Sequence, residues 1–322
     1  MNGTERVARA IRGQETDRQP IYGWVFANMT DEITEYFGSV ADFEDRYEFD
    51  AAHLFSGFAL FDRPLLNRIA GQHGEITPDL LLKEPILLSP KDDGKYKGIR
   101  DTLAHHKKRG RFCYVQTPGF FECYNNVFGI ENHLMWLALY PDELRELYRR
   151  QAEWTKQYID QCVEIGVDMI HISDDWGAQK DLLFSPGTWE ELIRPHIKML
   201  VDHAHSRGVF VSLHSDGNIM KVADGIADLG FDLLHPWQES AGMSYDTYLE
   251  KYANRFAILG GVCVQSALGI LPRDRLESEI RRVFGKLRGK RWVVCTTHFV
   301  QSHCSVEDLE FAYDLIYRLA RE

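Results

Sequence analysis

The pattern that decides the fold lies in residues 169–214, MIHISDDWGAQKDLLFSPGTWEELIRPHIKMLVDHAHSRGVFVSLH. The segment begins with a short apolar run, residues 169–173, and ends with a second one, residues 209–214. Between them, residues 186–206 carry apolar side chains at three- and four-residue spacing, which is typical of an amphipathic helix. Two apolar strands separated by one helix indicate parallel strands joined by a right-handed crossover.

The same alternation of strand and helix recurs along the chain. Further helical patterns occupy residues 4–13, 273–287 and 305–319. The apolar runs that predict strands are residues 20–26, 49–55, 112–117, 169–173, 209–214, 232–237, 256–261 and 292–298. Eight strands separated by helices favour a closed barrel, so the sequence predicts one (β/α)8 TIM-barrel domain over residues 1–322. Residues 74–89 predict an inserted hairpin, and a doubly wound open sheet is the alternative architecture.

The composition is that of a globular protein unsuited to nucleic acid. Of 322 residues 44% are hydrophobic, and 48 acidic side chains outnumber 37 basic ones, giving a formal net charge of -11. Such a charge argues against a surface that binds a phosphate backbone. The first residues lack the apolar core of a signal peptide, and no apolar run approaches the roughly 18 residues of a membrane span. We therefore expect a cytoplasmic protein, and its six cysteines, which form no CxxC pair, fit reduced thiols.

Side chains at the ends of the apolar runs are the first candidates for a functional site, because TIM-barrel enzymes work at the carboxyl ends of their strands. Those ends are rich in groups that bind metals, protons or aromatic rings. They include Trp24, Phe55, Asp174, Asp175, Trp176, His214, Asp216, His235, Trp237, Gln238, Cys263 and His298. Because residues two apart on a strand point the same way, His214 and Asp216 are expected to share one site.

Five motifs follow one another along the chain in a specific order. They are TERVARAIRGQETDRQP, SDDWGAQKDLLFSPGTWEELIRPHIKML, LHSDGNI, HPWQESAGM and LGGVCVQ. Together they resemble the uroporphyrinogen decarboxylase superfamily, which also contains zinc-dependent methyltransferases that serve corrinoid proteins. The resemblance covers nearly the whole chain and implies a TIM barrel. It is greater to the methyltransferases of the O-demethylase type than to the decarboxylases themselves.

Two departures separate this chain from the decarboxylases. Their arginine-rich segment after the first strand corresponds here to GWVFANMTDE, which has no arginine. Their aspartate at the end of the second strand is replaced by Gly57, which follows Phe55 and Ser56. A substrate with many carboxylates requires cationic partners, because unpaired buried charges are costly. The sequence therefore disfavours uroporphyrinogen as the substrate.

The resemblance also implies a zinc site, for which two sets of ligands are open. In the first, His214 and Asp216 stand at the family's His-x-Cys pair and His298 at its distant cysteine. Zinc accepts both imidazole nitrogen and carboxylate oxygen. In the second, Cys263 binds the metal with His235 and with His298 or Cys304, a softer set that favours zinc more strongly. The ligands come from different strands, so their spacing does not choose between the sets.

The activity that the resemblance implies is transfer of a methyl group from a methoxylated, aromatic substrate to the cobalamin of a partner corrinoid protein. Zinc, or an acid such as Asp174 or Asp175, would activate the ether oxygen, because phenolate is a poor leaving group. His214, Asp216 and His298 are the other catalytic candidates. The side chains expected to bind the substrate are Trp24, Phe55, Tyr124, Trp176, Trp237 and Gln238. Two other functions stay open, a carboxy-lyase acting on a tetrapyrrole and a non-catalytic barrel that binds a corrinoid or tetrapyrrole.

Several candidates also have an ordinary structural interpretation. Asp174 and Asp175 can cap the turn that follows them, because aspartate accepts backbone N–H groups. His171 and His235 lie within apolar strands, where a histidine is usually a hydrogen-bonded core residue. The aromatic side chains can pack between strands and helices, which is their commoner position.

Overall fold

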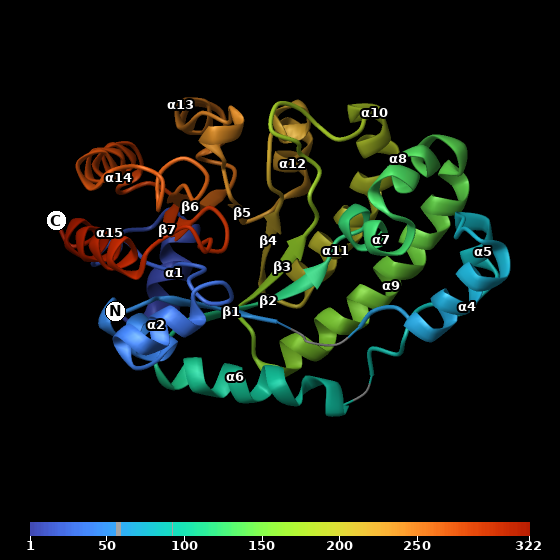
Figure 1. The fold of residues 1–322 in the computed structure, drawn as a ribbon, viewed down its shortest axis with the longest axis horizontal. Helices are drawn as coiled ribbons and strands as arrows, with labels where there is room; N and C mark the ends of the chain where they lie inside the picture. Colours follow the sequence, from blue (N-terminus) through green and yellow to red (C-terminus); the bar gives the residue numbers. More distant parts are fainter. Residues whose placement is uncertain (56–58, 92) are drawn as a thin grey trace. The chain divides into compact units, whose positions relative to one another are not determined.

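The computed structural model describes residues 1–55, 59–91 and 93–322, so Gly57 lies outside the described residues. These residues group into two compact units (Figure 1). The first consists of Met1–Ala52, His105–Cys113 and Asp232–Glu322, and the second of His53–Ala104 and Tyr114–Phe231. Each unit contains parallel strands and the helices that follow them. The single domain over residues 1–322 stays a prediction.

The second unit is built on parallel strands whose carboxyl ends meet at one edge. β3 (Met169–Ser173) lies between β2 (Phe112–Pro118) and β4 (Phe210–His214), and β2 enters this unit from the first. In this register Ser173 lies opposite His214. Every residue of β3 is buried, which explains why the strand appears in the sequence as a continuous apolar run.

Helices accompany the strands of the second unit (Figure 1). α9 (Pro141–Ile165) ends at Gly166, whose left-handed backbone closes the helix, and it packs against α11 (Arg194–Ser206) and α5 (Pro78–Leu82). The other helices are α4 (Arg63–His73), α7 (Phe121–Phe128), α8 (Ile130–Leu139), α10 (Pro186–Thr188) and α12 (Ala223–Leu229), with a 3-10 turn at Met220–Val222.

The helix predicted over residues 186–206 is confirmed, with one irregular turn. A π turn at Trp189–Ile193 separates α10 from α11. Pro195 follows it and has no backbone N–H to donate to the preceding turn, so the regular hydrogen-bond pattern is interrupted there.

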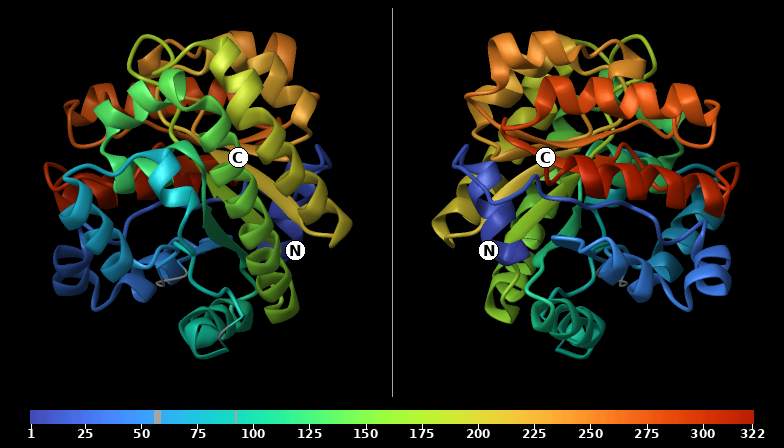
Figure 2. Two further views of the ribbon diagram at one scale, coloured as in Figure 1. Left: turned by 90° about the vertical axis from the view of Figure 1, so that its right-hand side faces the viewer. Right: turned by 90° about the vertical axis from the view of Figure 1, so that its left-hand side faces the viewer.

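The first unit has its own parallel strands, β5 (Leu233–His235), β6 (Ala257–Val262) and β7 (Trp292–Thr296). α14 (Arg273–Leu287) and α15 (Val306–Leu319) lie side by side (Figure 2) and confirm the two helices predicted near the C-terminus. The remaining helices are α1 (Gly3–Ile11), α2 (Thr30–Phe37), α3 (Val40–Arg46) and α13 (Tyr245–Thr247), with turns at Glu239–Ala241 and Tyr248–Tyr252. β1 (Ala51–Leu54), the turn Asp93–Tyr96 and α6 (Lys97–Lys108) belong to the segments that connect the units in sequence.

One of the eight predicted strands is wrong. Residues 20–26 contribute a single parallel bridge, between Ile21 and Val294 of β7. The ladder stops because the Trp24 N–H donates to the side-chain hydroxyl of Thr296 at 2.9 Å instead of to a backbone carbonyl. The described residues therefore form an α/β fold with seven parallel strands, and a closed eight-stranded barrel stays a prediction.

The hairpin predicted over residues 74–89 is also wrong. Pro78 occupies the first turn of α5, where its fixed φ favours a helix, and Leu80 to Leu82 continue that helix. Leu87 forms an isolated antiparallel bridge with Phe61. The leucine-rich stretch was compatible with strand or helix, and the proline at its start decided for the helix.

A buried ion group fixes the start of β1 in the first unit. The Asp50 carboxylate accepts hydrogen bonds from Arg6, from Arg18 at 2.6 Å and from the Ile21 N–H at 2.8 Å. Asp50 is 1% exposed, and its buried charge is paired with the two arginines. The group joins α1, the segment before the Ile21 bridge and β1.

No helix among the described ranges is both long and apolar enough to cross a membrane.

Candidate active site

Polar side chains gather at the carboxyl ends of β2, β3 and β4 in the second unit. We call Glu122, Asp174, Asp175, His214 and Asp216 the strand-end cluster. The Asp174 N–H donates to the His214 carbonyl at 2.9 Å, which holds the end of β3 beside the end of β4. The cluster thus lies at or just after the ends of three consecutive parallel strands, where enzymes of this fold class place their chemistry.

Asp174 anchors the loop before α7. Its Oδ2 accepts the Phe120 N–H at 3.0 Å and its Oδ1 accepts the Glu122 N–H at 2.8 Å. Gly119 is required for this approach, because a Cβ there would lie 2.2 Å from Asp174 Cβ. Burial raises the pKa of Asp174 to about 6, although the backbone donors act in the opposite direction. The capping interpretation fits Asp174, but the N–H groups it binds belong to Phe120 and Glu122 at the start of α7, not to the turn that follows Asp174.

His214 lies between two carboxylates. Its Nε2 is 3.6 Å from Asp175 Oδ1 and 3.9 Å from Asp216 Oδ1. Asp175 Oδ1 also accepts the Asp216 N–H at 2.8 Å, so Asp175 fixes the backbone that carries Asp216. Burial raises the pKa of Asp216 to about 6, with Asp175 adding to the effect and His214 opposing it. The structure thus brings His214 and Asp216 together, as their i, i+2 spacing led us to expect.

The turn after β4 depends on glycine. Gly217 has φ +78°, and a Cβ there would lie 2.6 Å from the backbone of Gly177. The Asn218 N–H donates to the Ala178 carbonyl at 2.8 Å. Close backbone packing of these two loops therefore sets the position of Asp216 relative to Asp175.

Glu122 is the member of the cluster that our sequence reasoning missed. The Ser173 hydroxyl donates to its Oε2 at 3.1 Å. Burial, together with the carboxylates of Asp175 and Asp174, raises the pKa of Glu122 to about 8. The available signal was its place shortly after the predicted strand 112–117, in the first turn of the helix that follows.

The donor atoms of the second unit fit one part of a zinc site. His214 Nε2 and Asp216 Oδ1 are types of atom that zinc accepts, and His214 Nε2 also lies 3.6 Å from a further carboxylate oxygen, that of Asp175. A cation is also favourable on electrostatic grounds, because burial and, to a lesser extent, neighbouring carboxylates raise the pKa values of Glu122 and Asp216. His298, the third ligand of the first predicted set, belongs to the first unit, and its role as a ligand stays a prediction.

His235 and His298 are associated with Trp24 within the first unit. The Trp24 ring lies 4.2 Å from the His235 ring and 6.0 Å from the His298 ring, between centroids. His235 Nε2 donates to the Thr296 carbonyl at 3.0 Å. Gln301 Nε2 lies 3.4 Å from His298 Nδ1. This unit thus contains a buried tryptophan flanked by two histidines.

The structure does not assemble the second predicted ligand set. The Cys263 thiol donates to Ser240 Oγ at 3.4 Å, and the Cys304 thiol to the Ser305 carbonyl at 3.4 Å. Burial raises the pKa of Cys304 to about 12, which disfavours the thiolate that a metal requires. Within the described ranges, no group of three close His, Cys, Asp or Glu ligands contains either cysteine.

The aromatic candidates for substrate binding differ in their exposure. Phe55 is 42% exposed, whereas Tyr124, Trp176 and Trp237 are at most 1% exposed. Tyr124 packs on Phe61, and the Trp237 N–H donates to the Ser244 carbonyl at 2.9 Å, both within their own units. Trp176 packs against Trp189 in the π turn, and Gln238 donates to Gln265 at 2.7 Å. These contacts fit the packing interpretation of the buried aromatic side chains, and contact with a substrate stays a prediction.

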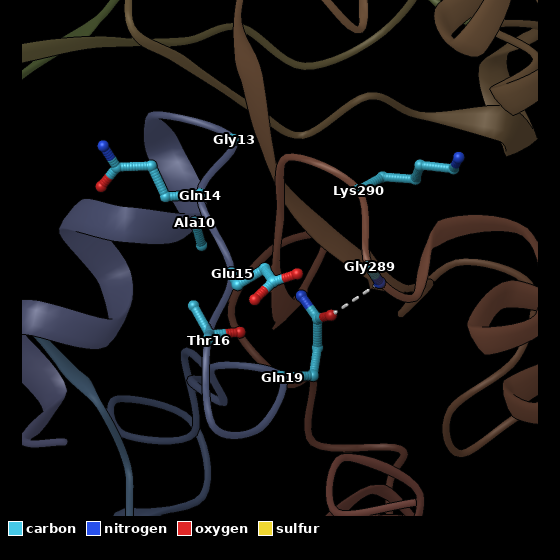
Figure 3. Close-up of a pocket in the computed structure, with 8 residues that line it drawn as sticks. All are labelled: Ala10, Gly13, Gln14, Glu15, Thr16, Gln19, Gly289 and Lys290. Carbon is cyan, nitrogen blue, oxygen red and sulfur yellow. Dashed lines mark hydrogen bonds between the residues drawn. The ribbon is translucent and has the colours of Figure 1, made fainter.

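A separate polar cavity of about 260 Å³ lies near the amino end of β7 (Figure 3). Gln19 and Gly289 face each other across it, and the Gly289 N–H donates to Gln19 Oε1 at 3.3 Å. The cavity lies at the amino end of its strand, whereas the strand-end cluster lies at the carboxyl ends of its own strands. Catalytic groups of this fold class stand at carboxyl ends, so we do not assign the chemistry to this cavity.

Comparison with known proteins identifies the family. The sequence pattern of the family described as uroporphyrinogen decarboxylase (URO-D) matches residues 123–319. The chain belongs to the URO-D family. This confirms the resemblance seen in the ordered motifs. A search of curated protein sequences gave no match.

Solved structures give a similar fold. A methyltransferase from Methanosarcina mazei has a TM-score of 0.71 and 15% sequence identity, over 98% of each chain. A sugar phosphate isomerase/epimerase from Parabacteroides distasonis has a TM-score of 0.49 and 10% identity, over 94% of this chain and 97% of that one. A B12-independent methionine synthase from a Shewanella species has a TM-score of 0.46 and 8% identity, over 69% and 65%. At such identities the URO-D chain shares a fold with the first of these and nothing more is implied.

Proposed function

We propose that this URO-D family member is a methyltransferase that moves a methyl group from a small methoxylated, aromatic substrate to the cobalamin of a partner corrinoid protein, with zinc activation. The observation that carries the proposal is the strand-end cluster, in which one imidazole lies among carboxyl groups at the ends of β2, β3 and β4. Family membership and the fold shared with a methyltransferase support the same class.

The charge of the cluster discriminates between substrate classes. A porphyrinogen carries several carboxylates, which the carboxylates of Asp174, Asp175 and Asp216 would repel. A methyl ether is neutral, so it enters an acidic site without that cost. Like charges placed against a ligand are a common way to reject it. The cluster therefore favours a methyl ether over the tetrapyrrole of the lyase hypothesis.

In the proposed site, His214 and Asp216 would hold zinc, with His298 as the expected third ligand. Zinc bound there supplies Lewis-acid polarisation of the ether oxygen. Asp175 positions Asp216 through the bond to its backbone N–H, and groups of this kind orient metal ligands. The cluster as a whole excludes anionic competitors from the reacting centre.

Metal analysis tests the ligands. We expect about one zinc per chain, lost in His214→Ala and kept in His205→Ala, a control histidine that is exposed on α11. Cys263→Ser is expected to keep the metal. Loss of zinc in Cys263→Ser but not in His214→Ala would move the metal to the second ligand set and contradict the assignment.

Activity is tested by mixing the zinc-loaded chain with a reduced corrinoid protein and a panel of methoxylated aromatics. Methylation of the cobalamin changes its visible absorption, so transfer is followed directly. We expect turnover with at least one aromatic methyl ether. No absorption change across the panel, with zinc bound, would refute the proposed function.

A further inference from the structure

We infer that Ser215 is a positioning residue of the proposed metal site, and that it holds the His214–Asp216 pair in place by accepting a backbone hydrogen bond from the loop after β3. This inference rests on the proposed function and adds to it a residue outside the predicted ligands. Ser215 lies between the two expected ligands in sequence and is 1% exposed. Its role follows from the way in which β3 and β4 separate at their carboxyl ends.

The backbone ladder between β3 and β4 ends at the last paired residues. Ser173 lies opposite His214, and the Asp174 N–H donates to the His214 carbonyl at 2.9 Å. In a continuing parallel ladder, the next N–H groups of both strands would donate to backbone carbonyls. Here they donate to side chains, so the two loops separate while they stay bonded to each other.

Two side chains replace the carbonyls, one from each loop. The Trp176 N–H donates to Ser215 Oγ at 3.0 Å, and the Asp216 N–H donates to Asp175 Oδ1 at 2.8 Å. We call these two bonds the reciprocal clasp, because each loop supplies one side-chain acceptor and one backbone donor. Asp175 thus fixes the backbone of one expected ligand, and Ser215 fixes the peptide segment just before it.

The reciprocal clasp is anchored on the β3 side by a buried ring. The Trp176 side chain is fully buried and packs edge-to-face on Trp189 in the π turn, with ring centroids 5.7 Å apart. The backbone N–H of this anchored residue bonds to Ser215. The segment from His214 to Asp216 is therefore attached to a well-packed part of the second unit.

The position of Ser215 bears directly on the two expected ligands. His214 Nε2 and Asp216 Oδ1 lie 3.9 Å apart, and their residues flank Ser215 in the chain. Removing the Ser215 hydroxyl would leave a buried N–H group of Trp176 without its acceptor, which is costly. The loop would then shift toward another acceptor, and Asp216 would move with it. Replacing groups that orient metal ligands typically weakens metal binding by about 10- to 100-fold.

The experiment compares zinc binding in wild type, Ser215→Ala and Ser185→Ala. Ser185 is the matched control, because its hydroxyl also accepts one backbone N–H, that of Thr188 at 3.0 Å, but it caps α10 and lies outside the reciprocal clasp. Zinc affinity is measured by competition with a chromophoric chelator, on protein whose fold is checked by circular dichroism. We expect Ser215→Ala to bind zinc about 10- to 100-fold more weakly and Ser185→Ala to bind it as tightly as wild type.

The visible spectrum of the cobalt(II)-substituted chain is a readout independent of turnover, because its d–d bands follow the geometry of the ligands. We expect these bands to change in Ser215→Ala. In Ser215→Thr, which keeps the hydroxyl acceptor, we expect the bands and the zinc affinity of wild type. A serine that only stabilised the fold would lower the melting temperature without moving the bands.

Three results would overturn the inference. Ser215→Ala with the zinc affinity and cobalt bands of wild type would overturn the positioning role while the proposed function stands. A loss of affinity in Ser215→Thr as large as in Ser215→Ala would do the same, because the acceptor atom would then not be the cause. Absence of zinc binding by the wild type would overturn the proposed metal site and the inference together.

Discussion

Replacing Glu122 by glutamine should make the metal-free protein more stable at neutral pH. The pKa of Glu122 is raised from an ordinary value of 4.5 to about 8 in the folded chain, chiefly by burial. The unfolded chain therefore releases this proton first as the pH rises. The contribution of Glu122 to stability is fully present below about pH 4.5 and is lost as the pH rises toward 8.

The magnitude follows from the two pKa values. Each unit of pH between them corresponds to about 1.4 kcal/mol, so at pH 7 the ionised carboxyl of the unfolded chain costs the fold up to about 3 kcal/mol. Glutamine does not titrate and still accepts the bond from Ser173. The free energy of unfolding of Glu122→Gln should thus exceed that of the wild type by an amount that grows with pH.

Urea unfolding followed by circular dichroism measures this difference. Wild type, Glu122→Gln and a control, Glu131→Gln at an exposed position on α8, are compared in the presence of a chelator at several pH values from about 5 to about 8. We expect the curves of wild type and Glu122→Gln to diverge with pH, and those of wild type and Glu131→Gln to stay parallel. If the difference in free energy of unfolding between wild type and Glu122→Gln is constant over this pH range, the conclusion that Glu122 is buried and neutral is refuted.

Three further outcomes test other parts of the fold. Burial lowers the pKa of His133 to about 3. The unfolded chain therefore takes up the proton first below pH 6.5, and acid destabilises the fold. Between about pH 7 and 5.5 the free energy of unfolding of the wild type, measured in urea, should fall by about 1.4 kcal/mol more than that of His133→Gln. Gly217→Ala should lower the zinc affinity and the melting temperature through the clash after β4, whereas Gly208→Ala, with the same φ of +78° but open space around it, should keep the zinc affinity. Asp50→Asn should cost about 1.5–3 kcal/mol in urea unfolding, because it weakens the charged hydrogen bonds that Arg6 and Arg18 donate to this buried position, while Arg6 keeps its pair with Asp17; a cost below about 1 kcal/mol would contradict the role of the buried ion group.

Local patterns in the sequence were sufficient for most of the secondary structure. β3 and α14 have the predicted bounds, because a continuous apolar run and a three- to four-residue spacing are local signals. The prediction of a strand at residues 20–26 failed because a strand also needs backbone partners, and the Trp24 N–H bonds to a threonine side chain instead. The prediction of a hairpin at residues 74–89 failed because one proline in a helix-compatible position outweighed the strand-like composition.

The candidate site also has a part that the sequence predicted and a part that it did not. His214 and Asp216 were predictable, since strand ends and i, i+2 spacing are properties of a single segment. The burial of Tyr124 and Trp237 was not, because an aromatic side chain at a strand end can turn toward a helix as readily as toward a substrate. The sequence alone also left the two zinc ligand sets equal, and the thiol contacts of Cys263 and Cys304 now weigh against the second.

The sequence by itself thus determined the family, the alternation of strands and helices and the segment that carries His214. Only the tertiary structure decided which groups surround it. Asp174 meets the N–H of Glu122 across 52 residues of sequence, and Ser173 meets its carboxyl group across 51. The protonation of Glu122 depends on burial and on charges contributed by other strands, and such quantities exist only once the chain has folded.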